Sequence, residues 1–194
     1  MKNLFLIALM AIGLQANAQS SWSIDPYHTQ IKFDVTHMVI STVGGDFKKF
    51  TINLGGNPTE KDFSAATVTA SIDVNSINTD NDMRDGHLKS PDFFDAAGHP
   101  EIKFVSTSFV KLNDSEYEIK GNLTVRETTK PVTFKAKYRG AVKDQKGKVH
   151  VGFQAMLTIN RMDYGLKWNN AMEAGGLVVG PDVNIVVNTE IVQN

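Results

Sequence analysis

Most of this chain alternates apolar and polar residues with a period of two, the pattern of β-strands that bury one face. In residues 31–37, for example, Ile31, Phe33 and Val35 share one face, while the residues between them are polar. Five further stretches show the pattern clearly, at 66–74, 117–125, 132–140, 149–159 and 183–192, and two show it weakly, at 47–54 and 101–112. The alternation therefore predicts eight strands in all.

Short turn signals separate these strands, among them Gly44-Gly45, Gly55-Gly56-Asn57-Pro58, Asn113-Asp114 and Lys146-Gly147. Long strands joined by short hairpins favour an antiparallel up-and-down order. Closing such a sheet on itself removes its exposed edges. We therefore expect an all-β fold, an eight-stranded antiparallel up-and-down barrel, which is wide enough to hold its own side chains or one slender ligand.

One long stretch, residues 78–101, interrupts the strands. Asp80 is a candidate N-cap for a short helix, Pro91 a residue that would end it, and Met83 and Leu88 are expected to share its apolar side. The stretch therefore predicts a helical insertion packed over one end of the barrel. A second irregular stretch, 161–181, is rich in glycine and aromatic residues and could form the other part of a mouth.

The first 18 residues have the composition of a secretory signal peptide. Lys2 precedes an apolar run from Leu4 to Leu14, and Ala16-Asn17-Ala18 has the small residues of a cleavage site. The run is shorter than the about 20 residues that a transmembrane helix needs. We therefore expect cleavage after Ala18, a single domain at 19–194, no integral membrane segment, and a bacterial protein that is periplasmic or secreted.

The composition excludes several classes of function. The absence of cysteine removes thiol catalysis, thiolate zinc sites and cysteine-held iron–sulfur clusters. A net charge of -1 without a basic run gives no support for nucleic-acid binding. No phosphate loop, dinucleotide fingerprint or G-x-S-x-G elbow is present, so no cofactor is expected. The five histidines form no HxH, HxxxH or HExxH pair, so no metal site is expected, although distant histidines could converge in space.

The charged stretch "RDGHLKSPDFFD" (84–95) has two interpretations. Asp85 and His87 could form an acid–base dyad, with Arg84 holding an anion. Alternatively, Arg84 and Asp85 are structural polar residues that fasten the insertion to the barrel rim, because arginine is a good donor for strand-end carbonyls. The absence of an obvious nucleophile favours fastening. Arg161 and Asp163, in "INRMDYG", are interpreted in the same way.

The sequence gives two indications of a hollow barrel. The inward positions mix phenylalanines with small residues, namely Ala70, Gly121, Ala136 and Ala155. In addition, the insertion is longer than a hairpin needs, which is typical of lids and binding loops. A solid core made by the same strand faces is the alternative.

Four segments together resemble one known family: "WSIDPYHTQIKFDVTHM", "NDMRDGHLKSPDFFDAAGHPEIKFVST", "GNLTVRETTKPVTF" and "LTINRMDYGL". They are similar to the YceI-like family of exported bacterial lipid-binding proteins over about residues 22–191. The resemblance implies a lipocalin-like barrel around an apolar tunnel that binds long isoprenoid chains, such as polyprenyl alcohols or prenylated quinones. It brings no catalytic residues. Glu127 departs from the family pattern, which commonly has glycine at this turn position.

The sequence therefore predicts a non-enzymatic carrier that holds an isoprenoid or similar long-chain lipid. The positions expected to contact the lipid inside the barrel are Phe33, Val35, Val68, Ile72, Phe104, Leu123, Phe134, Phe153, Leu157 and Ile185, and those expected at the mouth are Met83, Leu88, Phe94 and Trp168. Two other functions remain open: a lipid-modifying enzyme that uses His87 and Asp85, and an interaction module with a solid barrel. Unpaired strand ends and the loop at 167–181 are compatible with a homodimer.

Overall fold

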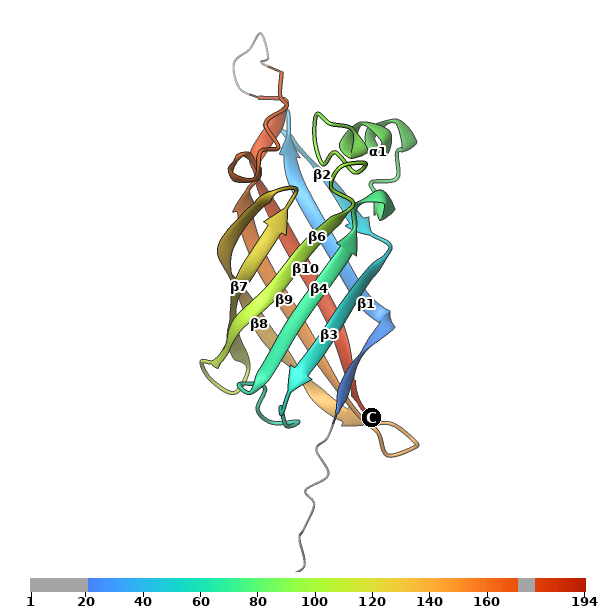
Figure 1. The fold of residues 1–194 in the computed structure, drawn as a ribbon. Helices are drawn as coiled ribbons and strands as arrows, with labels where there is room; N and C mark the ends of the chain where they lie inside the picture. The colour runs from blue at the N-terminus through green and yellow to red at the C-terminus, as the bar shows by residue number, and fades with distance from the viewer. Residues whose placement is uncertain (1–20, 171–176) are drawn as a thin grey trace, which may run out of the picture.

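The computed structural model describes residues 21–170 and 177–194, so the expected signal peptide and part of the irregular stretch 161–181 lie outside the described residues. Antiparallel strands dominate (Figure 1). The strands are β1 (Trp22–His37), β2 (Ser41–Phe47), β3 (Phe50–Gly56), β4 (Ala66–Asp73), β5 (Ile77–Asn78), β6 (Glu101–Lys111), β7 (Glu116–Val125), β8 (Thr128–Lys143), β9 (Val149–Asn160) and β10 (Val179–Gln193). The helical segments are α1 (Asp82–Lys89) and two 3-10 turns, η1 (Val74–Ser76) and η2 (Arg161–Tyr164).

The strands form one curled, barrel-like sheet in the order β3-β4-β6-β7-β8-β9-β10-β1-β2-β5 (Figure 1). The predicted all-β, barrel-like class is confirmed. The predicted number of strands is wrong, because the described sheet has ten strands rather than eight. The stretch 47–54 was expected to be one strand. Instead, β2, which pairs with β1, ends at Phe47, and β3, which pairs with β4, begins at Phe50. Backbone hydrogen bonds from Lys48 to Ser76 and from Asp73 to Lys49 tie this crossing point to the segment after β4.

Gly44 and Gly45 were expected to form a turn, but both lie inside β2. Gly45 pairs with Phe33 in the β1–β2 ladder. A Cβ atom at Gly45 would lie 2.5 Å from the Phe33 ring and 2.8 Å from the Thr79 side chain. Here glycine permits a close approach rather than a turn, so the ring of Phe33 can lie across β2.

The insertion forms the predicted short helix, but two details of that prediction are wrong. The N-cap is Asn81, whose side chain accepts a hydrogen bond from the Arg84 amide, and not Asp80. Met83 does not share the apolar side with Leu88, because it is 87% exposed. Residues five apart on a helix are rotated by about 140° from one another, so the two side chains point in different directions. Leu88 packs on the core and Met83 faces solvent.

The end of the barrel opposite α1 is solid. We call it the plug end, and define it by the buried cluster Trp22, Phe63, Ala66, Phe109, Tyr117, Ala136, Val149, Val151, Phe153 and Ile191. Phe63, from the β3–β4 loop, is 0% exposed and packs its ring 5.4 Å from Trp22 and 5.0 Å from Phe153.

Side-chain donors fix the plug loop that carries Phe63. Trp22 Nε1 donates to the Pro58 carbonyl at 3.0 Å, Tyr138 Oη to the Glu60 carbonyl at 3.2 Å, and Lys111 Nζ to the Lys61 carbonyl at 3.2 Å. These three donors come from three different strands. The loop is therefore held across the barrel end, with Phe63 directed inward.

Candidate functional site

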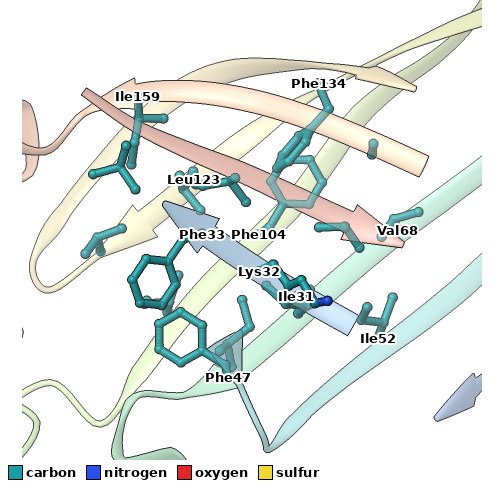
Figure 2. Close-up of a pocket in the computed structure, with 18 of the residues that line it drawn as sticks. Ile31, Lys32, Phe33, Phe47, Ile52, Val68, Phe104, Leu123, Phe134 and Ile159 are labelled. Atoms are coloured by element: carbon teal, nitrogen blue, oxygen red, sulfur yellow. The ribbon is translucent and has the colours of Figure 1, made fainter. Parts of the chain in front are cut away.

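The other half of the barrel, below α1, contains an apolar cavity with a volume of about 230 Å³ (Figure 2). Its wall comes from nine strands, from the insertion and from the turn around η2. Phe109, Phe153 and Ile191 of the plug end form part of it. We call this region the hollow half. Among its described lining residues, Lys32, Arg161, Tyr164 and Thr189 carry a polar group, and the remainder are apolar.

The structure places most of the predicted lipid-contacting residues on this cavity wall. Those that line it are Phe33, Val35, Val68, Ile72, Leu88, Phe94, Phe104, Leu123, Phe134, Phe153 and Ile185. Strand parity brings together all of these except Leu88 and Phe94, because alternate residues of every strand point to the same side of a curled sheet. Leu88 and Phe94 come from the insertion. That they contact a lipid remains a prediction.

Three of the predicted residues do not line the cavity. Met83 faces solvent. Leu157 packs against the core of the hollow half without reaching the open space. Trp168 lies outside the wall, with its ring 5.3 Å from Phe93 and 4.8 Å from His87.

Several lining residues were not selected from the sequence. Ile31, Ile52, Ile102 and Ile119 follow the same strand alternation and could have been found from it. Ile24 lies on the other side of the β1 bulge, where the alternation changes phase, so its inward position does not follow from Ile31 and Phe33. Phe47, Phe93, Tyr164 and Leu166 lie at strand ends or in turns, where alternation gives no direction. Their inward positions follow from the path of the chain at the α1 end.

A second glycine helps to shape the cavity wall. Gly121 lies inward on β7, and a Cβ atom there would lie 2.4 Å from the Phe104 ring. The ring of Phe104 therefore lies over the backbone of β7 and meets Phe134 edge-on at 5.3 Å. Because Gly121 has no side chain, the Phe104 ring can lie close to the β7 backbone, where it occupies less of the barrel interior.

Arg84 and Asp85 both bind Thr79, the residue that follows β5. Arg84 Nε donates to Thr79 Oγ1 at 2.8 Å, and Nη2 donates to the Thr79 carbonyl at 2.7 Å. The buried Asp85 carboxylate accepts from the Thr79 amide at 3.0 Å and from its hydroxyl at 2.5 Å. These bonds attach the first turn of α1 to the end of the short edge strand.

His87 and Asp85 do not form a dyad. His87 Nε2 lies 3.0 Å from Asp92 Oδ2, and its ring meets Phe93 and Trp168 edge-on. The Asp85 oxygen that accepts hydrogen bonds is directed to Thr79 instead. Among the described residues, no hydrogen bond or ion pair joins the two side chains, so the arrangement expected of an acid–base pair is not formed.

Arg161 lines the cavity at the start of the β9–β10 connection. Its guanidinium donates to the carbonyls of Gly180, Leu166, Trp168 and Val179, at distances between 2.5 and 3.0 Å. Burial lowers the pKa of this guanidinium from its ordinary value. Asp163 is exposed and lies 3.5 Å from Lys130 Nζ, so it does not neutralise Arg161.

The β7–β8 turn also lies at the α1 end. The residue in the left-handed backbone region there is Arg126, with a φ of 53°, and Glu127 is not in that region. Arg126 donates from Nη1 to the Phe93 carbonyl at 3.2 Å, which links this turn to the insertion. Glu127 lies outside the cavity wall.

Comparison with known proteins agrees with this fold. The family model described as "YceI-like domain" matches residues 22–191. A UPF0312 protein of Staphylococcus aureus (strain MSSA476) is 36% identical over 172 residues, which is 88% of this chain and 96% of the relative. The chain therefore belongs to the YceI-like family.

Solved structures show the same architecture. Burkholderia cenocepacia BcnA matches with a TM-score of 0.72 and 21% identity over 87% of this chain and 99% of that protein. The Campylobacter jejuni YCEI protein matches with a TM-score of 0.66 and 26% identity, covering 80% of this chain and 87% of the other. A polyisoprenoid binding domain from Saccharophagus degradans matches with a TM-score of 0.63 and 15% identity, over 90% of this chain and 99% of that domain.

Proposed function

We propose that this protein is a non-enzymatic carrier that holds the apolar chain of an isoprenoid-type lipid, such as a polyprenyl alcohol or a prenylated quinone, in the hollow half of its barrel. The single observation that carries the proposal is the apolar cavity lined by the strand faces. An aliphatic chain needs no hydrogen-bond partners, and this wall offers few. The fold shared with a polyisoprenoid binding domain supports the same ligand class.

The size of the hydrophobic contribution is sufficient for useful affinity. Removing about 400 Å² of ligand surface from water would contribute on the order of 10 kcal/mol before association costs. Binding with a Kd of about 1 μM or tighter then requires no polar anchor. Such a site discriminates poorly between lipids of similar width, because one methylene group changes the binding free energy by at most about 1–3 kcal/mol.

A carrier must also take up and release its lipid, and the α1 end supports this step. The β1–β2 turn there exposes Met38, Val39 and Ile40, the last at 87%. Met38 and Val39 have positive φ values of 51° and 64°, which are unfavourable for residues with these side chains. A strained turn that exposes adjacent apolar residues is typical of a functional site rather than of a stability feature.

The sequence at the N-terminus supports export, and we place the carrier in the periplasm or outside the cell. Lys2, the apolar run and the Ala16-Asn17-Ala18 site together support a signal peptide. In the described part of the chain, no helix has the length and apolar character needed to cross a bilayer.

Native mass spectrometry of the purified protein, followed by lipid extraction, tests the proposal. We expect one adduct per protein molecule, with the mass of a prenyl-chain lipid that appears in the extract. An Ala70→Phe variant, which places a ring in the cavity, should lose the adduct. The carrier proposal should be abandoned if the wild-type protein is empty and also fails to bind an apolar fluorescent dye, in which case the interaction-module function is favoured.

The same lipid extraction also tests whether the protein is a lipid-modifying enzyme. If the protein converts the extracted lipid to a product and His87→Ala removes that conversion, the protein is a lipid-modifying enzyme. Unchanged lipid mass on incubation, with the same adduct in the His87→Ala variant, supports the carrier.

A further inference from the structure

A group of histidine and carboxylate side chains lies on the outer face of the sheet, away from the cavity. Asp25 of β1, Glu190 of β10 and His150 of β9 occupy outward positions on three adjacent strands. His28 completes the group from a bulge in β1. Asp25 and His28 are three residues apart on β1, and the register of the three strands brings Glu190 and His150 beside them.

Possible ligand atoms of Asp25, His28 and Glu190 lie close together. His28 Nδ1 lies 2.8 Å from Asp25 Oδ2 and 4.0 Å from Glu190 Oε2. Donor atoms of all three residues lie within 4.8 Å of one another. Tetrahedral zinc, with ligand bonds of about 2.0–2.1 Å, needs donor atoms about 3.4 Å apart. Small side-chain rotations would bring the three atoms to that spacing, and the 65% exposed His28 ring has room to make them.

The backbone of β1 is shaped to present His28. Residues Pro26 to Thr29 stand opposite the single residue Thr189, so β1 bulges away from β10 at this point. The Tyr27 amide donates to Asp25 Oδ1 at 2.8 Å, which leaves Oδ2 facing His28. Pro26 lacks an N–H group, so it leaves no ladder donor unsatisfied. Bulges of this kind direct a side chain that a regular strand would point elsewhere.

The charges of the group favour a cation. Asp25 stands directly opposite Glu190 in the β1–β10 ladder, and like charges in that position destabilise a sheet. Within the described ranges, the basic groups found within 4.0 Å of these two carboxylates are His28 and His150.

His150 is positioned to orient the Glu190 carboxylate. Its Nδ1 is 2.6 Å from Glu190 Oε1, the oxygen atom that does not face His28, and its Nε2 is 3.4 Å from Asp144 Oδ2. Outer-shell partners of this type orient a ligating carboxylate. Asp144 in turn is fixed by the Lys146 and Lys148 amides at 2.8 and 2.9 Å.

We infer that Asp25, His28 and Glu190 form a binding site for a divalent transition-metal ion of the zinc type, with His150 as the residue that positions Glu190. An imidazole nitrogen with two carboxylates suits zinc and leaves a fourth position for water or an external ligand. The site lies on the outer face of β1 and β10, so it is independent of lipid in the cavity.

Isothermal titration of untagged protein with Zn²⁺, together with the visible absorption of its Co²⁺ complex, tests this inference. We expect one saturable ion per chain, and loss of at least about tenfold in affinity in His28→Ala and in Glu190→Gln. His150→Ala should weaken binding by about tenfold while the Co²⁺ spectrum keeps its shape.

The matched control is His99→Ala, which removes a histidine that also has two carboxylates within 4.0 Å, Asp95 and Glu127. Its affinity should equal that of the wild type. The inference is overturned if the wild type shows no saturable binding, or if His99→Ala removes binding while His28→Ala does not. Because His28 is exposed, circular dichroism of His28→Ala should match the wild type, so lost binding would not reflect unfolding.

Discussion

The two halves of the barrel are made of the same alternating strands, yet one is solid and the other is hollow. At the plug end, the rings of Phe109, Tyr117 and Tyr138 lie 5.5–6.2 Å from one another or from Phe153, and the β3–β4 loop inserts Phe63 among them. In the described part of the hollow half, the loop residues Phe93, Phe94 and Leu166 line the wall, and the cavity remains between the strand faces. Strand alternation determines which side chains point inward. Whether those side chains fill the interior depends on the loops, as the insertion of Phe63 at the plug end shows.

The largest difference between the halves should appear when one phenylalanine is removed from each. Phe63→Ala at the plug end should lower the free energy of unfolding by about 3–5 kcal/mol, because the ring is wholly buried and its loss leaves a new cavity. Phe33→Ala, beside a space that already exists, should cost about 1–2 kcal/mol. Urea unfolding of both variants measures this difference. Equal losses would show that the two halves are packed alike.

Adding a ring should also destabilise the plug end more than the hollow half. Ala136→Phe at the plug end should overpack a buried position and lower the free energy of unfolding by about 1–3 kcal/mol. Ala70→Phe in the hollow half should change stability by less than about 1 kcal/mol but weaken lipid binding by about tenfold or more, since the ring takes the ligand's place. Thermal unfolding and a lipid-displacement assay give the two readouts. Strong destabilisation by Ala70→Phe would contradict an open cavity.

The fastening of the insertion offers a smaller effect. Asp85→Ala should leave the buried Thr79 amide and hydroxyl without their acceptor, at a cost of about 1–3 kcal/mol. Hydrogen exchange should become faster in residues 79–89, with no change at the plug end. Asp92→Ala is the control, because this carboxylate is exposed and pairs with His87, so its loss should cost less than about 0.5 kcal/mol. Similar exchange in both variants would count against the fastening role.

The smallest effect concerns the plug loop. Tyr138→Phe removes the hydrogen bond to the Glu60 carbonyl and should cost about 0.5–1.5 kcal/mol without changing lipid affinity. Tyr27→Phe is the control, since Tyr27 is 89% exposed, and it should leave the free energy of unfolding unchanged. A loss of lipid affinity in Tyr138→Phe would show that the plug end and the cavity are coupled.

Much of the fold could be predicted from the sequence, because a period of two fixes the inward face of each strand wherever the register is regular. Phe33, Val68 and Phe104 were placed correctly on that inward face for this reason. The prediction failed where a local signal has two explanations. Gly44-Gly45 is compatible with a turn and with a close approach, and only the position of the Phe33 ring decides between them.

Other features depend on contacts between distant segments. Phe63 lies in a polar loop, so its role as a plug follows only from the hydrogen bonds of Trp22, Tyr138 and Lys111 to that loop. The group around His28 and Glu190 depends on strand register and on the bulge in β1. Met83 was misplaced because its distance along the helix from Leu88 puts it on a different face.

The most direct test of the hollow half is methyl NMR of the protein titrated with farnesol, a short prenyl alcohol. The account predicts that the methyl signals of Val68, Ile72 and Leu123, which line the cavity, shift in a saturable way. The signals of Val149 and Val151, buried in the plug end and away from the cavity wall, should stay in place. Saturable shifts confined to the plug end, or none in either half, would contradict the account.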